Sequence, residues 1–189
     1  MLAATWHSNR NNGQATPVVF LHGLLGSQED WQGVITLLQN FPQFRALTID
    51  LPFHGKSEKI ACQDFADLRT QLHQTLTSLL GDTPFFLVGY SLGGRVALDY
   101  TFHTQNPHLL GTILEGTNIG LKTEAECQAR WQNDQCWANR FRKEPITQVL
   151  NDWYQQPIFA HLDACKRSIL IEKRQHNSAK NIAQMLEST

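Results

Sequence analysis

The strongest constraint on how this chain can fold is the segment PFFLVGYSLGGRVAL at residues 84–98. It holds an apolar run of strand length, then Gly-Tyr-Ser-Leu-Gly, and then residues with helical spacing. A serine at the tip of a sharp strand-to-helix turn lies in strained backbone, and Gly89 and Gly93 give the chain room to pass it. The following helix directs its first N–H groups toward any negative charge beside Ser91. We therefore interpret the segment as a nucleophile elbow; the alternative is a glycine-rich turn that happens to contain a serine.

Short apolar runs alternate with amphipathic segments in the first part of the chain. We expect strands at residues 17–21, 46–49, 85–88 and 112–114. Helical spacing follows the first three runs, with capping patterns that begin at Ser27 and Asp64. Part of residues 1–16 could add an edge strand. This alternation is typical of a mostly parallel sheet with flanking helices, so the predicted fold class is α/β.

Polar or glycine-rich loops follow each of the four expected strands. His22, Asp50, Ser91 and Glu115 each stand at or just beyond the carboxyl end of one of them. In open parallel sheets, ligands bind at the edge formed by these carboxyl ends. Four independent features at one edge predict that the functional site lies there.

The chain changes character after Gly120. No strand candidate follows Leu114, and helical spacing is predicted at residues 123–142, from Pro145 onward, and at 163–175 and 178–187. We therefore divide the chain into an α/β core at residues 1–120 and a helical unit at residues 121–189. We interpret the helical unit as a lid over the site; the alternative is a plain C-terminal helical extension.

Composition argues against several classes of function. The chain has 189 residues, 41% of them hydrophobic and 17% charged, as in an ordinary globular protein. A net charge of −1 indicates no nucleic-acid partner, and no apolar run approaches the ~20 residues of a membrane-spanning helix. The chain opens without a signal-peptide pattern, and its four cysteines form no C-x-x-C pair. We expect a cytoplasmic protein with reduced thiols and no metal site; no particular oligomeric state is indicated.

The elbow implies a set of catalytic partners. A serine hydroxyl needs a histidine to take its proton, and a carboxylate usually orients that histidine. An oxyanion would be held by backbone N–H groups, typically that of the residue after the serine and one from the loop after an earlier strand. These are Leu92 and Leu24 in this chain. His22 lies in the same loop as Leu24, and we expect it to be a structural histidine.

The histidine that the elbow requires is not evident in the sequence. In this architecture the triad's acid and base follow the serine, on loops after late strands. His103, His108, His161 and His176 follow Ser91, but none of them comes after an expected strand, so we expect surface or packing positions. The sequence therefore indicates a chain that stops before the strands that carry the acid and the base.

Several motifs together resemble one family. FLHGLLGSQEDW, DLPFHG, LVGYSLGGRVAL, ARWQNDQCWANRF and VLNDWYQQPIF are similar to segments of the 2-succinyl-6-hydroxy-2,4-cyclohexadiene-1-carboxylate synthases of menaquinone biosynthesis, which have the α/β-hydrolase fold. The similarity runs from about Pro17 to Thr189. The family continues past that point, through strands that bear the triad's Asp and His. The resemblance thus implies an α/β-hydrolase fold with a helical lid, C-terminally truncated so that the last strands are missing.

The resemblance also implies an activity. Enzymes of this family are lyases that use no cofactor. They abstract a ring proton from 2-succinyl-5-enolpyruvyl-6-hydroxy-3-cyclohexene-1-carboxylate and thereby eliminate pyruvate. Ser91 would belong to the proton-abstracting triad, and Leu24 and Leu92 would hold the oxyanion. The residues expected to bind this small polycarboxylate are Tyr90, Arg95, Arg130, Trp153, Tyr154 and Arg174. Guanidinium groups bind carboxylates bidentately, which suits such a substrate; the alternative for each arginine is a solvated helix face.

Two other interpretations stay open. A serine ester or C–C bond hydrolase on the same fold would form an acyl-enzyme at Ser91. A truncated product without the triad's base would show no turnover, because loss of the base costs orders of magnitude in rate.

Overall fold

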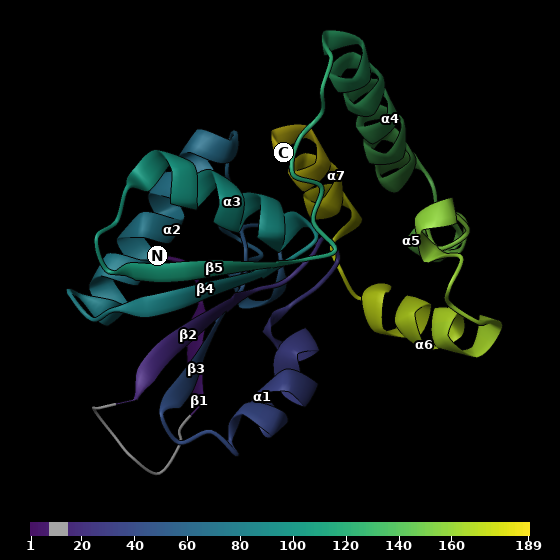
Figure 1. Cartoon of the computed structure of the whole chain (residues 1–189). Helices are drawn as coiled ribbons and strands as arrows, with labels where there is room; N and C mark the ends of the chain where they lie inside the picture. The colour runs from purple at the N-terminus through teal and green to yellow at the C-terminus, as the bar shows by residue number, and fades with distance from the viewer. Residues whose placement is uncertain (8–14) are drawn as a thin grey trace. The chain divides into compact units, whose positions relative to one another are not determined.

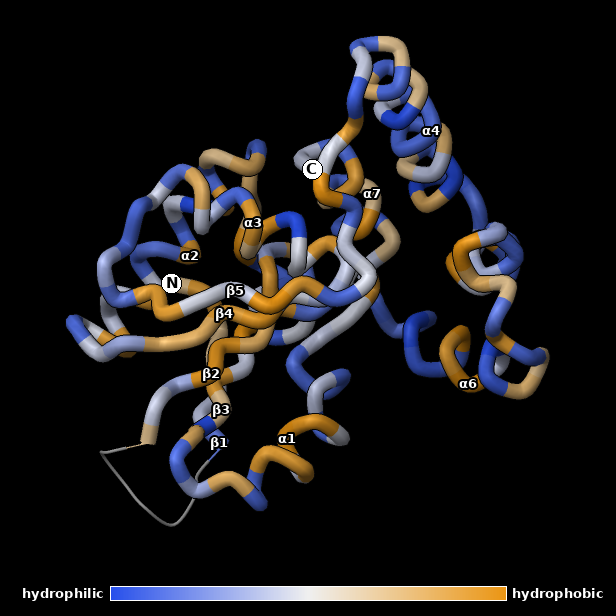
Figure 2. The backbone as a smooth tube through the Cα atoms, in the orientation of Figure 1, coloured by the Kyte–Doolittle hydropathy of each residue, from blue (hydrophilic) through white to orange (hydrophobic). Residues whose placement is uncertain are grey.

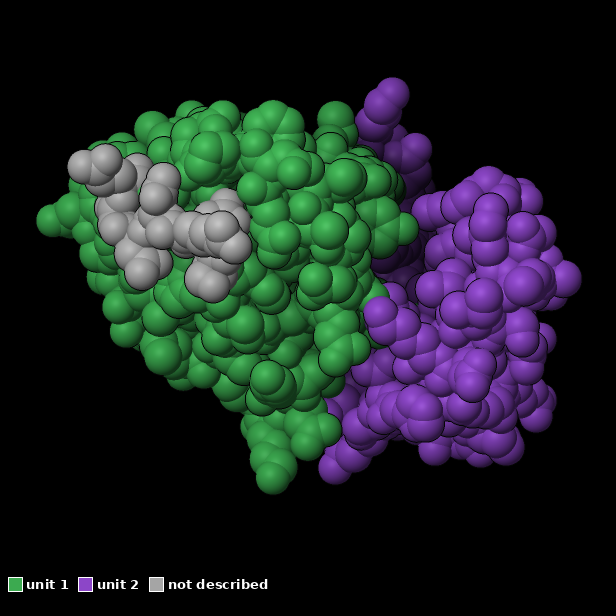
Figure 3. Space-filling view, turned by 90° about the horizontal axis from the view of Figure 1, so that it is seen from below, with its two compact units in different colours: residues 1–121, 188 green, residues 122–187, 189 purple. Residues whose placement is uncertain are grey.

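The structure, a computed structural model, describes residues 1–7 and 15–189. The chain divides into two compact units (Figure 3). The first consists of residues 1–121 with Ser188, and the second of residues 122–187 with Thr189. The first unit contains the sheet and the second contains helices only.

The first unit is built on a five-stranded sheet with the order β1-β3-β2-β4-β5 (Figure 1). The strands are β1 (Ala4–His7), β2 (Thr16–Leu21), β3 (Phe44–Ile49), β4 (Phe85–Tyr90) and β5 (Leu109–Glu115). All neighbours pair in parallel except β1, which runs antiparallel to β3 at the edge. The predicted α/β class and the four predicted strands are confirmed. The expected edge strand is found at β1; the rest of that expectation, at residues 8–14, lies outside the described residues.

Helices cover both faces of this sheet, with α1 on one side and α2 and α3 on the other (Figure 1). Their bounds are α1 (Gln32–Leu38), α2 (Phe65–Leu80) and α3 (Leu92–Thr104). Trp31 and Ile35 pack with Val18, Phe20 and Val88 on the α1 face. Helical spacing predicts that Val34 faces inward with them, but its side chain is 43% exposed. Only a narrow stripe of this two-turn helix meets the sheet, and Val34 lies outside it.

Local capping determines where these helices begin. Ser27 and Asp30 form the predicted capping box ahead of a short 3₁₀ turn, Gln28–Trp31. The Asp64 carboxylate accepts the N–H of Asp67 at the start of α2. Gly81 ends α2 with a φ of 54°. Figure 2 shows that β2 and β4, which lie inside the sheet, are hydrophobic along most of their length. This is expected of parallel strands that are covered on both faces.

The second unit contains four helices. They are α4 (Glu124–Lys143), α5 (Ile146–Trp153), α6 (Ala164–Arg174) and α7 (Ala179–Ser188), with a 3₁₀ turn at Pro157–Phe159. Thr123 and Glu126 form the predicted capping box of α4. Pro145 stands one residue before α5, as its N-cap, rather than at its first helical position. No helix in the described part of the chain is long and apolar enough to cross a bilayer.

Aromatic rings and an ion-pair group join α4 to α5. The Trp153 ring lies 4.9 Å from that of Trp137, edge to face, and 6.1 Å from that of Phe141. Arg140 pairs with Glu144 at 2.8 Å and also with Asp152. The hydrogen bond from Arg140 lowers the pKa of the Glu144 carboxyl. The aromatic contacts, which include the buried Phe141, give the second unit a packed interior of its own, whereas the ion pairs lie at its surface.

Strand β5 forms one edge of the described sheet. It pairs with β4, and no strand of the described residues pairs with its other side. Leu110 and Ile113 on this strand are more than half exposed. An open edge that carries large apolar side chains is a surface that proteins usually cover.

Candidate active site

Ser91 occupies the tip of a strand-to-helix turn, between the end of β4 and the start of α3. Its φ of 51° and ψ of −112° lie in a region that costs a non-glycine residue ~1–3 kcal/mol. The Ser91 N–H donates to the carbonyl of Glu115 at the end of β5, at 2.9 Å. Its carbonyl accepts the N–H of Arg95 at 3.1 Å, which starts the helix. The surrounding structure thus holds the serine in the strained geometry of a nucleophile elbow.

The glycines beside Ser91 are required by close backbone approaches. A Cβ atom added to Gly89 would lie 2.3 Å from the carbonyl oxygen of Gly93. One added to Gly93 would lie 2.3 Å from the carbonyl oxygen of Leu21, at the end of β2. Real Cβ atoms do not come this close to backbone, so the motif's glycines are steric necessities of the elbow.

We expect Gly93→Ala to lower the free energy of unfolding by about 2–4 kcal/mol, because the added methyl group would collide with backbone that cannot move aside. Gly33→Ala is the matched control, because a Cβ at Gly33 meets nothing within 4 Å and the residue lies in α1. Alanine should stabilise the chain there by about 0.5–1 kcal/mol. Urea unfolding of both variants measures the difference. An equal effect of the two substitutions would contradict the steric explanation.

The loop after β2 lies directly beside the elbow. A Cβ atom on Gly23 would be 3.3 Å from the Cβ of Ser91 and 3.0 Å from the ring of Tyr90. Leu24 is the next residue, and Leu92 begins α3 immediately after the serine. The structure therefore brings the residues predicted as serine and oxyanion donors to one edge of the sheet.

The loop after β3 is tied to the loop after β2 by a buried carboxylate. Asp50 accepts the backbone N–H and the side-chain amide of Gln28, at 2.8 Å and 2.9 Å. It also accepts the N–H of Lys56 at 2.9 Å. Gly55 passes so close that a Cβ would lie 2.5 Å from this carboxylate. Asp50, which the sequence pattern assigns to the site edge, thus organises the two loops.

Histidines of the first unit form hydrogen bonds and ion pairs with groups other than Ser91. The ring nitrogens of His22 contact the carbonyl of Gly23 at 2.8 Å and the N–H of Leu51 at 3.0 Å, which confirms a structural role. His103 is paired with Asp99 on α3, and His108 lies 3.3 Å from Asp82. His54 contacts the carbonyl of Pro52 at 2.8 Å and the N–H of Leu25 at 3.1 Å, and His73 lies 3.2 Å from the hydroxyl of Tyr100.

Two of the predicted substrate-binding residues adjoin the elbow. Tyr90 precedes the serine and is 45% exposed. Arg95 lies four residues after Ser91 in α3, one turn along the same face. Its guanidinium is 4.9 Å from the centre of the Phe65 ring, a cation–π contact that orients the side chain.

The other four predicted residues lie in the second unit. Arg130 on α4 donates from Nε to the buried carboxylate of Asp134 at 2.6 Å. Trp153 ends α5, and Arg174 ends α6. The buried Tyr154 packs its ring 5.0 Å from that of Phe159.

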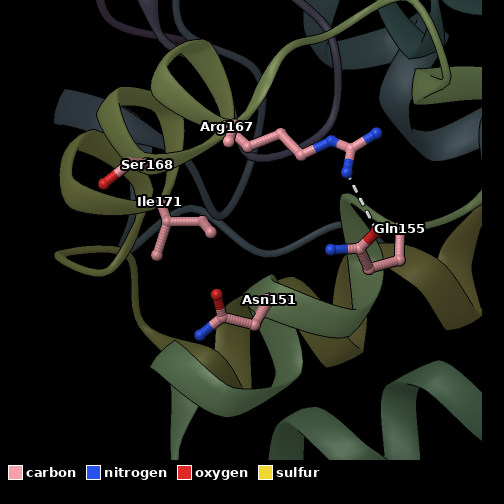
Figure 4. Close-up of a pocket in the computed structure, with 6 residues that line it drawn as sticks. Asn151, Gln155, Arg167, Ser168 and Ile171 are labelled. Carbon is pink, nitrogen blue, oxygen red and sulfur yellow. Dashed lines mark hydrogen bonds between the residues drawn. The ribbon is translucent and has the colours of Figure 1, made fainter.

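A cavity of about 430 Å³ in the second unit lies between α5 and α6 (Figure 4). It is lined by Asn151, Gln155, Ala164, Arg167, Ser168 and Ile171. Arg167 donates to the side-chain oxygen of Gln155 at 2.9 Å. None of the predicted site residues lines this cavity. The described residues contain no cluster of three or more side chains able to hold a metal ion.

Comparison with known proteins agrees with this fold and site. The family model described as alpha/beta hydrolase fold matches residues 16–184. The chain is 44% identical over 188 residues to the 2-succinyl-6-hydroxy-2,4-cyclohexadiene-1-carboxylate synthase of Yersinia pseudotuberculosis, covering 100% of this chain and 68% of that protein. A Haemophilus influenzae relative is 50% identical over 174 residues, covering 91% and 69% of the two chains. MenH from S. aureus has a TM-score of 0.87 at 28% identity, covering 100% of this chain and 71% of that one.

The sheet order, the strained serine and the family model together define a protein of the α/β-hydrolase fold. The chain belongs to the 2-succinyl-6-hydroxy-2,4-cyclohexadiene-1-carboxylate synthase family of that fold. The family expected from the sequence motifs is therefore confirmed. The chain spans between 66% and 69% of the length of three curated relatives.

Proposed function

We propose that this chain carries the elbow, the oxyanion donors and the carboxylate-binding arginines of a pyruvate-eliminating lyase. Its substrate is 2-succinyl-5-enolpyruvyl-6-hydroxy-3-cyclohexene-1-carboxylate. The main support is the strained Ser91 beside the loop of Leu24, in a chain 44% identical to a synthase of this family. In this proposal the triad's Asp and His come from the part of the relatives' length that these 189 residues do not span.

The structure of the substrate explains why an oxyanion must be held. Ring carbon 2 bears the succinyl ketone and adjoins the ring double bond, so loss of its proton yields an enolate. The electrons then move through the ring to form the 2,4-diene and expel the enolpyruvyl oxygen from carbon 5. The leaving group takes up a proton and becomes pyruvate. Ser91, activated by the triad's histidine, accepts the ring proton, and the N–H groups of Leu24 and Leu92 stabilise the enolate oxygen.

The substrate's three carboxylates match the three predicted arginines, and the reaction as proposed uses no cofactor. Arg95 lies one turn from Ser91, while Arg130 and Arg174 belong to the helical unit. We propose that this unit, residues 121–189, acts as a lid. Tyr90, Trp153 and Tyr154 would line the pocket around a small polycarboxylate in the cytoplasm.

Asp134 is expected to prepare Arg130 for this role. It occupies Nε of Arg130, so the terminal nitrogens of that side chain, which is 39% exposed, are left to bind a carboxylate. Asp134→Ala should raise KM by about tenfold with kcat changed less than about threefold. The reason is that Arg130, without Asp134 to orient it, would lose a substrate carboxylate contact that stabilises the ground state and the transition state alike. Glu144→Ala is the control, because it removes the carboxylate partner of Arg140 on the same helix. Equal KM values for the two variants would contradict the proposal.

The activity can be tested with the substrate itself. Pyruvate release is followed with lactate dehydrogenase and NADH, and diene formation by ultraviolet absorbance. Two proteins are compared: the 189-residue chain, and the same chain joined to the remaining length of the Yersinia pseudotuberculosis relative. We expect equal amounts of pyruvate and diene from the joined protein, and at least about 10³-fold slower release from the chain alone.

Two outcomes would contradict the proposal. If the joined protein releases no pyruvate but shows an ester-hydrolysis burst with an acyl group on Ser91, the chain belongs to a hydrolase. If the 189-residue chain alone reaches the rate of the joined protein, the triad's base lies within these residues.

A further inference from the structure

The loop after β2 makes a tight turn beside Ser91. The N–H of Gly26 donates to the carbonyl of Gly23 at 2.9 Å and closes the turn. Leu25 has a φ of 66°, whereas Leu24 is not among the residues with positive φ. This is the pattern of a type II turn, whose third position normally requires glycine. Leucine at that position is strained, so neighbouring groups must hold the turn in place.

Two buried histidines hold two successive peptide groups of this turn. The ring nitrogen Nδ1 of His22 is 2.8 Å from the carbonyl oxygen of Gly23. The N–H of Leu25 donates to Nε2 of His54 at 3.1 Å. The Gly23 carbonyl and the Leu24 N–H belong to one planar peptide group and point in opposite directions. Fixing the carbonyl therefore fixes the direction of the Leu24 N–H.

The hydrogen-bond partners determine the protonation of both rings. A backbone N–H can only donate, so Nε2 of His22 accepts the N–H of Leu51 and Nε2 of His54 accepts that of Leu25. Each ring then carries its proton on Nδ1, which donates to Gly23 in one case and to the carbonyl of Pro52, at 2.8 Å, in the other. Both histidines are buried.

The two rings also link the loops after β2 and β3 reciprocally. His22 belongs to the first loop and accepts from Leu51 in the second. His54 belongs to the second loop and accepts from Leu25 in the first. Their ring centres are 5.1 Å apart. These hydrogen bonds connect the turn beside Ser91 to the loop after β3, which Asp50 also holds in place.

We propose that His22 and His54 are positioning residues that aim the Leu24 N–H at the oxyanion formed beside Ser91. The assignment of that N–H as an oxyanion donor rests on the proposed function. The geometry of the turn does not depend on the proposed function, so the hydrogen bonds of the two histidines can be tested in the 189-residue chain without measuring turnover. Neither histidine contacts the substrate in this role; each acts through the backbone that it holds.

Crossed amide substitutions separate this role from simple space filling. A Gln side chain reaches the position of Nε2, and an Asn side chain reaches that of Nδ1. His54→Gln therefore keeps an acceptor for Leu25, whereas His54→Asn withdraws it. His22→Asn keeps a donor for the Gly23 carbonyl, whereas His22→Gln withdraws it.

The backbone amide signals of Leu24 and Leu25 are measured by NMR in the ¹⁵N-labelled chain. We expect His54→Asn to speed hydrogen exchange at the Leu25 amide by at least about tenfold relative to His54→Gln. The Leu24 amide resonance should move in His22→Gln and stay near its original position in His22→Asn. Leu72→Ala, a buried change on α2, is the control for general loss of stability.

A kinetic measurement on the joined protein completes the test. His54→Asn should lower kcat by about 10²-fold with KM within about twofold, and His54→Gln should recover most of the loss. If Gln and Asn are interchangeable at both positions in the amide signals, the positioning role is wrong, whether or not the protein is a synthase. If the amides respond as expected but kcat does not, the histidines do not serve the oxyanion hole. Absence of turnover in the unsubstituted joined protein counts against the proposed function, and the amide signals alone then decide whether the histidines hold the turn.

Discussion

Ser91→Ala is expected to lower pyruvate release by about 10³-fold or more in the joined protein, because the hydroxyl that accepts the ring proton is lost. The coupled lactate dehydrogenase assay measures the rate. The KM for the substrate should change little, since the proposed carboxylate contacts lie on the arginines. A variant that keeps more than about a tenth of the activity would show that Ser91 is not the group that receives the proton.

Ser91→Gly separates catalysis from backbone strain. Glycine also removes the hydroxyl, but it adopts the φ of 51° without a Cβ penalty. We therefore expect Ser91→Gly to be as inactive as Ser91→Ala and to be more stable than it by about 1 kcal/mol. Urea unfolding of the pair measures this difference. Equal stabilities would mean that the elbow stores no strain at the serine.

Asp50→Ala is expected to lower the free energy of unfolding by about 3–5 kcal/mol. The substitution leaves the backbone N–H and the side-chain amide of Gln28 buried without their acceptor, and each unsatisfied donor costs about 1–3 kcal/mol. It also removes the acceptor of the part-buried N–H of Lys56. Chemical unfolding followed by circular dichroism measures the loss. It should be accompanied by faster amide exchange in the loops after β2 and β3.

Asp30→Ala is the matched control for Asp50→Ala. Asp30 is also a carboxylate that accepts a backbone N–H, but it lies at an exposed capping position. Its removal should cost about 1 kcal/mol, because water can replace the lost bond. If Asp50→Ala costs no more than Asp30→Ala, the buried carboxylate does not organise the two loops.

The parts of the fold predicted from the sequence are those encoded by neighbours in the chain. Ser27, Asp64 and Thr123 each cap a helix through a residue three positions away. Gly89 and Gly93 stand within the motif whose turn they permit. Spacing reveals such interactions directly. Val34 shows the limit, because its exposure depends on how much of α1 the sheet covers.

The sequence pattern does not reveal the contact of His54, because its partner is distant in the chain. Its partner Leu25 is 29 residues away, as Gln28 is 22 residues from Asp50. No local pattern relates such positions. The only signal available was that polar residues follow two apolar strands, which become neighbours when β2 pairs with β3.

The sequence by itself determined the α/β alternation, the serine elbow, the helix boundaries and the family, because these depend on residue size, polarity and spacing within a few turns of chain. The tertiary structure decided which polar groups meet. It showed that Asp50 joins two loops, that Asp134 binds Arg130, and that two buried histidines contact the backbone of the turn beside Ser91. Those contacts follow from strand pairing and burial, since a buried donor or acceptor must find its partner wherever the fold has placed one.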